Sequence, residues 1–269
     1  MNSLELAKKV RLKALELCFK KKASHLGGAF SVADILAVLY SDILEFDPNK
    51  PDLPGRDRLF YGKGHACTAL YSVLDECGFF SKYNLNEDFT KDNTHFTSHV
   101  SHHLPGIELS TGSLGHALGV ACGVAIALKL QQQNSHIFAI ISDGELDEGS
   151  TWESLLFASH HNLFNLTTIV DFNKIQSFGA VKDVLNLEPL QSKFESFGFK
   201  CLNIDGHDHN EIHSSLTAAK INKTRPMVVL ANTVKGKGVS FMENELLWHY
   251  KSPDESQYLD AVKELKTNL

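Results

Sequence analysis

The sequence predicts an α/β fold with a mainly parallel sheet that carries helices on both faces. Beyond residue 135, stretches expected as strands alternate with stretches expected as helices. The expected strands lie near 137–141, 166–171, 199–204 and 227–232, and the expected helices near 150–161, 188–197 and 209–222. Such alternation is typical of parallel sheets covered on both faces. A chain of 269 residues can bury one large core, so we expect one domain over residues 1–269.

The first half of the chain is expected to be mainly helical. A helix over 2–22 would end in a turn at Gly27 and Gly28, and Ser31 to Asp34 is similar to a capping box that would begin a second helix reaching about Glu45. The further elements expected are a strand at 58–61, a helix from the turn at 62–65 to about 78, an irregular stretch over 82–107, a tightly packed central helix over 115–130, and a last helix opened by residues 252–255.

Composition excludes several classes of function. The net charge is −6 and the chain has no basic stripe, so we expect no nucleic-acid partner. Five cysteines without metal or redox spacing indicate reduced thiols. The first thirty residues lack the apolar stretch of a signal peptide, and the longest apolar run, 118–128, is too short to cross a bilayer. We therefore expect a soluble, cytoplasmic protein without a membrane partner.

Two polar residues follow neighbouring expected strands. Asp143 ends the apolar run 136–142, and Asn173 ends the run 166–172. The expected crossover helix between them makes the strands parallel, so both side chains should lie at the carboxyl edge of the sheet, where ligands bind. Carboxylate and amide oxygens suit Mg²⁺ bound together with phosphates. A helix cap and a turn asparagine are the alternative, and the spacing favours the metal site.

The chain has fourteen histidines, and each taken alone is more often structural than catalytic. The set His95, His99, His102 and His103 could suggest zinc, but no nearby cysteine or acid completes a ligand set. A loop that contributes one histidine to a cleft is the favoured interpretation. Three further histidines stand out by their context. His25 lies between two expected helices, His65 follows a glycine turn after an expected strand, and His249 follows a tryptophan.

Two glycine loops are weak signals by themselves. Gly112 would let backbone approach a ligand closely, although the loop 110–116 could be a plain helix start. Lys235 to Gly238 is similar to a phosphate cradle but lacks the complete P-loop pattern. Glu148 would be an acid in the first turn of a helix.

These motifs carry a family resemblance. Ser142-Asp143-Gly144 followed by Asp171-Phe172-Asn173-Lys174-Ile175 resembles the signature of thiamine-diphosphate enzymes, and the order of the other motifs resembles the N-terminal, diphosphate-binding domain of transketolase. The resemblance runs from about residue 5 to about residue 249. It implies a thiamine-diphosphate-binding fold in which Asp143, Asn173 and Ile175 bind Mg²⁺, while Gly144 and Asn173 contact the cofactor.

The resemblance also implies roles for four histidines. His65 and His249 would reach the diphosphate or substrate oxygens, and His25 and His99 would hydrogen-bond the hydroxyls of a ketose donor. All four are candidate catalytic residues, since neutral imidazoles can exchange protons with carbonyl and hydroxyl oxygens.

Other residues match family positions at the cofactor. Gly112 and Leu114 would contact the aminopyrimidine and the thiazolium, and Glu148 would lie near the contact with a partner domain. The loop Lys235–Gly238 would cover the diphosphate. The sequence departs from the family pattern at four positions that bear on substrate specificity, namely Ser24, His116, Ser142 and Ser177.

The sequence contains no match to the pyrimidine-binding domain that supplies the activating glutamate and the phosphate-binding arginines in this family. The resemblance therefore implies the N-terminal subunit of a split transketolase, inactive alone and paired with a C-terminal subunit in an α2β2 assembly. The reaction would transfer a two-carbon ketol unit from a ketose, or its phosphate, to an aldose. The alternatives are a 2-oxo-acid dehydrogenase E1 α chain, a deoxyxylulose-phosphate synthase fragment, or a non-catalytic cofactor-binding subunit.

Overall fold

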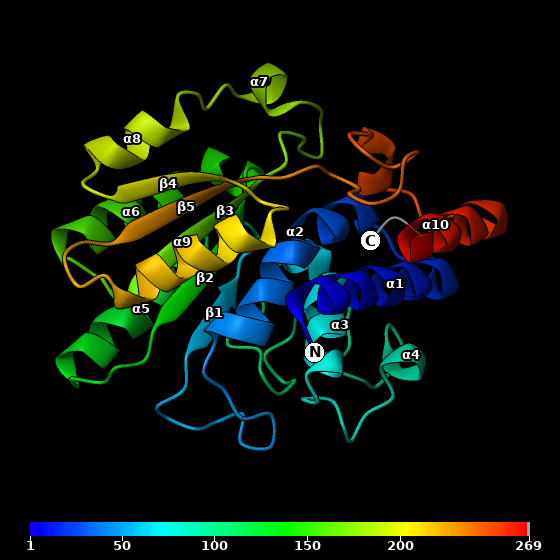
Figure 1. The fold of residues 1–269 in the computed structure, drawn as a ribbon, viewed down its shortest axis with the longest axis horizontal. Coiled ribbons are helices and arrows are strands. Elements are labelled where there is room, and N and C mark those ends of the chain that lie inside the picture. The colour runs from blue at the N-terminus through cyan, green and yellow to red at the C-terminus, as the bar shows by residue number, and fades with distance from the viewer. Residues whose placement is uncertain (268–269) are drawn as a thin grey trace.

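A five-stranded parallel sheet forms the centre of the computed structural model, which describes residues 1–267 (Figure 1). The strand order is β1-β2-β3-β5-β4, and every neighbouring pair is parallel. The strands are β1 (Arg58–Tyr61), β2 (Ile137–Ser142), β3 (Leu166–Phe172), β4 (Lys200–Asp205) and β5 (Met227–Asn232). The predicted fold class and all four strands predicted beyond residue 135 are confirmed.

Ten α-helices are described over residues 1–267. They are α1 (Ser3–Lys21), α2 (Leu26–Val38), α3 (Cys67–Glu76), α4 (Leu85–Asp88), α5 (Ala117–Leu130), α6 (Gly149–His160), α7 (Val181–Val184), α8 (Leu190–Ser196), α9 (His209–Ile221) and α10 (Glu255–Thr267). A π-helical turn (Leu39–Ile43) extends α2, and 3₁₀ turns lie at Gly64–Ala66, Gly144–Asp147 and Leu246–His249. The N-terminal α1 packs beside the C-terminal α10, where Phe19 and Tyr258 stack at 4.3 Å between ring centroids (Figure 1).

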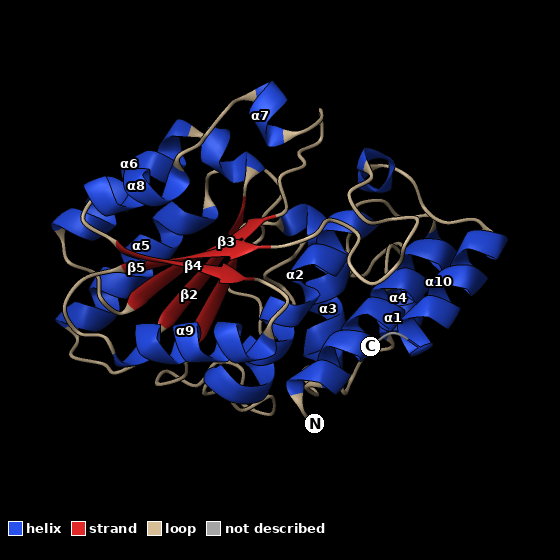
Figure 2. Ribbon diagram, turned by 45° about the horizontal axis from the view of Figure 1, so that its top comes forward, coloured by secondary structure: helices blue, strands red, loops and turns tan. Residues whose placement is uncertain are grey.

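Alternate residues of each strand enter two separate cores. In β2, Phe138 and Ile140 belong to the core that contains α2 and α9, whereas Ile137, Ala139 and Ile141 belong to the core under α5, α6 and α8. Figure 2 shows α6 and α8 on one side of the strands and α9 on the other. A strand whose residues are buried on both faces is expected when helices cover both sides of a parallel sheet.

The junction between α1 and α2 differs from the prediction. The first helix ends at Lys21, with Lys22 at φ 54° as its C-cap residue, and the second begins at Leu26 with His25 as its N-cap residue. Gly27 and Gly28 lie inside α2 rather than in a turn. Gly27 permits close packing, because a Cβ there would lie 3.0 Å from Lys235 Cγ. Ser31 does not cap a helix: its hydroxyl donates to a carboxylate of β3, Asp171 Oδ2, at 2.6 Å.

The prediction of a central α5 was wrong in part. Leu118, Ala121 and Ala125 are buried, but Val120 is 42% exposed and Leu130 is 79% exposed. The small residues therefore pack one face against β2 and α6 and leave the other at the surface. Among the described residues, the helix long and apolar enough to cross a membrane is 26–43, and 89% of it is buried inside the fold.

Candidate active site

A cavity of about 340 Å³ lies at the carboxyl edge of the sheet. The loops after β1, β2, β3 and β5 all reach it, as expected for ligand sites in open α/β sheets. Every predicted site residue lines this cavity, together with residues that the sequence did not single out. The lining residues are His25, Gly28, Lys63, His65, His99, Gly112, Leu114, Ser142, Asp143, Gly144, Asp147, Glu148, Asn173, Ile175, Gln176, Ser177, Phe178, Lys235 and His249.

Asp143 and Asn173 follow adjacent strands, since Ser142 is paired with Asp171 in the parallel register. Backbone N–H groups orient both side chains. Asp143 Oδ1 accepts from Gly144 N at 2.8 Å, and its Oδ2 accepts from Lys174 N at 2.7 Å. Asn173 Oδ1 accepts from Ile175 N at 3.1 Å. The two side chains are thus held in place before any ligand binds.

This donor set fits a hard divalent cation. Asp143 and Asn173 are 2% and 4% exposed, and both present oxygen ligands to the cavity, as Mg²⁺ prefers. Burial, together with the nearby Asp171, raises the pKa of Asp143 to about 7. A bound cation would offset that cost. Within the described chain no cluster of three His, Cys, Asp or Glu side chains could hold a metal, so the zinc site considered from the sequence has no support. Phosphate oxygens and backbone carbonyls would complete the coordination of Mg²⁺.

The four predicted histidines converge, although they come from four separate segments. His25 lies 4.9 Å from His249, 5.4 Å from His65 and 6.0 Å from His99, measured between ring centroids. His65 and His249 are 5.9 Å apart. Because no sequence periodicity links these residues, only the fold brings them together.

These imidazoles are neutral near pH 7. Burial, reinforced by neighbouring histidines and lysines, lowers the pKa of His25 to about 4 and that of His249 to about 3. Burial also lowers the pKa of His65 well below its usual range, and that of His99 to a smaller extent. Lys235 Nζ lies 3.0 Å from His249 Nδ1, and an ammonium can only donate, so His249 carries its proton on Nε2. Neutral imidazoles can both donate to and accept from substrate oxygens.

Glycines allow the loop 110–115 to approach the histidines. A Cβ on Gly112 would lie 3.0 Å from the His99 ring, and a Cβ on Gly64 would lie 2.2 Å from the Thr111 carbonyl oxygen. Gly115 has φ +82°, a conformation that favours glycine. Leu114 and Glu148 line the same cavity, and Glu148 is the N-cap residue of α6 rather than part of its first turn.

A buried ion pair that was not predicted from the sequence lies at the cavity. Lys63 Nζ contacts Asp171 Oδ2 and also donates to Gly28 O at 2.9 Å. Burial alone would raise the pKa of Asp171, but Lys63 and the hydroxyls of Ser31 and Thr233 lower it. Asp171 stands inside a motif that carries the resemblance, and its position as an acid within an apolar strand was the signal in the sequence that indicated a buried charge.

Lys235 is the lysine of the Gly/Lys loop that reaches the cavity. Its Nζ donates to Ile175 O at 2.9 Å and contacts His249 as described above. Lys237 does not line the cavity, and its Nζ lies 3.8 Å from Glu243. The loop thus supplies one cation to the cavity rather than a cradle of two.

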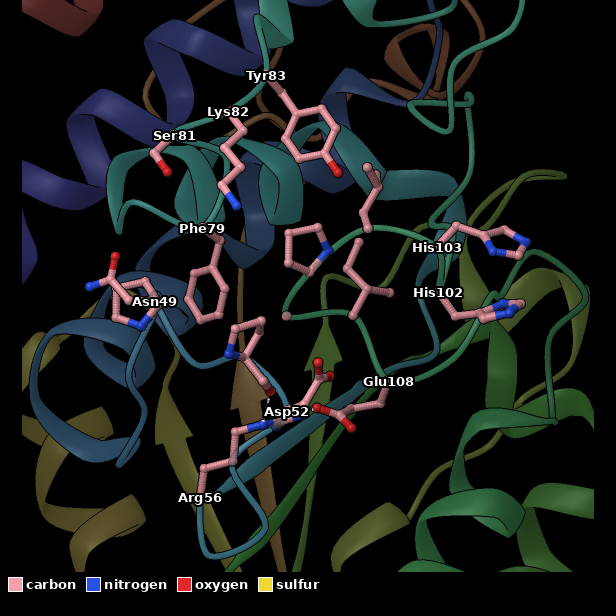
Figure 3. Close-up of a pocket in the computed structure, with 16 residues that line it drawn as sticks. Asn49, Asp52, Arg56, Phe79, Ser81, Lys82, Tyr83, His102, His103 and Glu108 are labelled. Atoms are coloured by element: carbon pink, nitrogen blue, oxygen red, sulfur yellow. Dashed lines mark hydrogen bonds and ion pairs between the residues drawn. The ribbon is translucent and has the colours of Figure 1, made fainter.

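Two of the atypical residues lie outside this cavity. Ser24 Oγ is within hydrogen-bond distance of His25 Nδ1, at 2.9 Å, and His116 faces the surface between α5 and α6. Ser142 and Ser177 do line the cavity. A larger cavity of about 630 Å³ lies elsewhere, over the ion pair of Arg56 and Glu108, and it contains none of the predicted site residues (Figure 3).

Comparison with known proteins agrees with this geometry. Residues 3–267 match the family model described as transketolase, thiamine diphosphate binding domain. The chain is 39% identical over 266 residues to one of the subunits of the apulose-4-phosphate transketolase of Actinobacillus succinogenes, covering 97% of this chain and 94% of that protein. It is 38% identical over 258 residues to the 6-deoxy-6-sulfo-D-fructose transketolase subunit SqwG of a Clostridium species, covering 96% and 94%.

Solved transketolases share the fold. The transketolase of Campylobacter jejuni superposes with a TM-score of 0.91 at 30% identity, and the match covers 99% of this chain but 43% of that one. The chain therefore spans about two fifths of that enzyme's length. With the family model matched over nearly all of the described residues, the chain belongs to the thiamine-diphosphate-binding domain family of transketolase.

Proposed function

We propose that this chain is the diphosphate-binding subunit of a two-chain transketolase, which transfers a two-carbon ketol unit from a ketose to an aldose. The observation that carries the proposal is the convergence of His25, His65, His99 and His249 on the cavity that also contains Asp143 and Asn173. A subunit that only bound cofactor would need the last two residues but not four neutral imidazoles.

The residues suit two neighbouring tasks. Asp143, Asn173 and the Ile175 carbonyl would hold Mg²⁺, and Gly144 and Lys235 would adjoin the diphosphate. When bound, thiamine diphosphate supplies the electron sink for breaking the C–C bond. The histidines would hydrogen-bond the sugar oxygens and move protons to and from them. Gly112 and Leu114 would contact the two rings of the cofactor.

We infer the partner subunit from a group that this cavity does not supply, the glutamate that activates the aminopyrimidine. In the described chain the acids at the cavity are Asp143, Asp147 and Glu148, and we assign none of them to activation of the aminopyrimidine. A pyrimidine-binding subunit would provide that glutamate, in an α2β2 assembly with the sites between subunits. Relatives of similar length are named as subunits, which supports this division.

The substrate class we propose is a ketose with an anionic end. One relative is named for a sugar phosphate and the other for a sulfonated sugar. Neither anion needs a site in this chain, because the partner subunit would bind the far end of the sugar while the histidines bind the end that reacts.

Co-expression with a pyrimidine-binding subunit, to be sought in the reading frames adjacent to that of this chain, tests the proposal. The complex should transfer ketol units from a ketose phosphate to an aldose, and each chain alone should not. Asp143→Ala should abolish Mg²⁺-dependent binding of thiamine diphosphate, measured by calorimetry, whereas Asp183→Ala at an exposed position of α7 should leave it unchanged.

Three outcomes would point to the alternatives. Turnover by the pure single chain would refute the division into two subunits. Decarboxylation of a 2-oxo acid by the complex, without ketol transfer, would identify an E1-type or synthase-type enzyme instead. Cofactor binding with no turnover on any of these substrates would favour a non-catalytic subunit.

A further inference from the structure

His207 connects a buried acid of α2 with the loop that carries Lys235. It lies in the turn between β4 and α9. Its Nδ1 is 2.6 Å from Asp34 Oδ2, and its Nε2 is 2.8 Å from the backbone nitrogen of Val234. Val234 directly precedes Lys235. One imidazole therefore joins three separate segments of the chain.

The partners of His207 determine which ring nitrogen donates a hydrogen bond and which accepts one. A backbone N–H can only donate, so Nε2 must be the unprotonated acceptor and Nδ1 must carry the proton. That proton is donated to Asp34, which is itself fixed by Arg11: the guanidinium contacts the carboxylate at 2.9 and 2.5 Å and is fully buried. Burial alone would raise the pKa of Asp34, but Arg11 and the two histidines that bond it hold that pKa well below its usual range. The acid is ionised and accepts a hydrogen bond from the Nδ1–H of His207.

The loop reached by His207 leads directly to the active site. After Val234, Lys235 donates to Ile175 O at 2.9 Å and contacts His249 at 3.0 Å. Gly236 N then donates to Gly27 O at 2.9 Å. The hydrogen bond between Val234 N and His207 thus fixes the backbone one residue before Lys235. The Lys235 ammonium in turn contacts Ile175, a predicted metal ligand, and His249, a predicted catalytic residue.

Gly206 shows how closely the two loops approach. A Cβ at this position would lie 2.4 Å from Thr233 Cγ2 and 3.0 Å from Asn232 O. Gly206 N also donates to Asn232 O at 2.7 Å. The turn that carries His207 is therefore pressed against the end of β5, where the Lys235 loop begins.

From this geometry we propose that His207 is a positioning residue for the active site. It holds Val234, and through it Lys235, in the place where the ammonium meets the cofactor diphosphate. The inference rests on the proposed cofactor site but not on the identity of the sugar or on turnover.

The chain offers a matched control. His209 contacts the same acid, with Nε2 3.1 Å from Asp34 Oδ1, and its side chain is 11% exposed against 12% for His207. Its other nitrogen, however, lies 2.8 Å from Ser3 Oγ at the start of α1. Loss of His209 removes a bond to Asp34 without touching the Lys235 loop.

The test compares His207→Ala, His207→Gln and His209→Ala in the full-length chain. Amide hydrogen exchange reports directly on the Val234 N–H: we expect exchange about tenfold faster in His207→Ala, unchanged in His209→Ala, and largely restored in His207→Gln, because a carboxamide can accept from Val234 and donate to Asp34. In the complex with the partner subunit, calorimetry should show thiamine diphosphate and Mg²⁺ binding about tenfold more weakly to His207→Ala alone.

Equal exchange at Val234 in His207→Ala and the unsubstituted chain would overturn the proposal. So would equal losses of cofactor affinity in the His207→Ala and His209→Ala variants, because a general loss of stability would affect both. If His207→Ala fails to fold, His207→Gln keeps the test decisive: cofactor affinity close to that of the unsubstituted chain supports the role, and a tenfold loss with Val234 still protected refutes it. Absence of ketol transfer would refute the proposed function and leave these measurements intact.

Discussion

The ammonium of Lys63 and the carboxylate of Asp171 form an ion pair beneath the candidate active site, with side chains that are 1% and 0% exposed. Lys63 comes from the turn after β1, and Asp171 lies in β3. Lys63 also donates to Gly28 O of α2 at 2.9 Å, and Asp171 accepts from Ser31 at 2.6 Å. The pair therefore ties together three elements that position His65, Asn173 and His25.

We expect Lys63→Met to destabilise the chain strongly. The substitution leaves Asp171 buried without its counter-charge, and removal of one partner of a buried pair costs about 3–5 kcal/mol. Denaturant unfolding followed by circular dichroism measures this loss. Lys63→Met combined with Asp171→Asn should recover much of it, since the carboxylate is then neutral. A single substitution that costs less than about 1 kcal/mol would show that the pair does not stabilise the fold.

Lys235→Met should affect ligand binding more than folding. Its hydrogen-bond partners are a carbonyl oxygen and an imidazole rather than a carboxylate, so its loss breaks no direct ion pair. We expect affinity for thiamine diphosphate with Mg²⁺ to fall about tenfold or more, as for the loss of a charge-assisted hydrogen bond. Lys237→Met is the control from the same loop, since that side chain pairs at 3.8 Å with Glu243. Equal effects of both substitutions in calorimetry would contradict the assignment of Lys235.

The strand ends could be predicted from sequence because their signals are local. Asp143 and Asn173 each follow an apolar run, and a helix lies between the two runs. The rules of parallel sheets then place both side chains at the carboxyl edge of the sheet. The convergence of the four histidines could not be derived in this way, since it depends on loops far apart in the chain. The family resemblance supplied it, and the distances between the rings agree.

Other features were mispredicted because tertiary contacts override local patterns. Ser31 has the local pattern of a helix cap, but its hydroxyl bonds Asp171 across the core. Gly27 and Gly28 suggested a turn, yet both lie inside α2, and Gly27 allows close packing against Lys235. The pairings of Lys63 with Asp171 and of His207 with Asp34 could not be predicted from local patterns, because the partners lie more than a hundred residues apart in sequence. Such contacts emerge only when the elements are assembled.

Two glycine substitutions should have opposite effects. Gly64→Ala would place a Cβ 2.2 Å from the carbonyl oxygen of Thr111, and this is backbone that must shift. We expect a loss of about 1–3 kcal/mol and weaker cofactor binding through displacement of Gly112. Gly123→Ala, on the exposed face of α5, meets no atom within 4 Å and should stabilise the single chain by about 0.5–1 kcal/mol. Thermal unfolding of both variants checks the signs.

Glu145→Gln should change how stability depends on pH. This side chain is 0% exposed; one oxygen accepts from Gly115 N at 3.1 Å and the other has no hydrogen-bond partner. Burial raises the pKa of Glu145 from 4.5 to about 7. Because the pKa of Glu145 is higher in the folded than in the unfolded chain, protonation of this acid favours the folded state. Its contribution to the free energy of unfolding is complete below pH 4.5 and is lost as the pH rises through about 7. Above that pH the chain holds a buried, partly unsatisfied carboxylate.

The neutral amide carries no such cost. Relative to the unsubstituted chain, Glu145→Gln should therefore gain up to about 3 kcal/mol between pH 4.5 and pH 8. Urea unfolding at a series of pH values measures the difference, and the titration of Asp143 cancels because both proteins contain it. Glu153→Gln, at an exposed position of α6, is the control for the same substitution at a site that is not buried. Parallel stability curves for Glu145→Gln and the unsubstituted chain would show that the pKa of Glu145 is the same in the folded and the unfolded chain, with its buried charge compensated by groups other than Gly115.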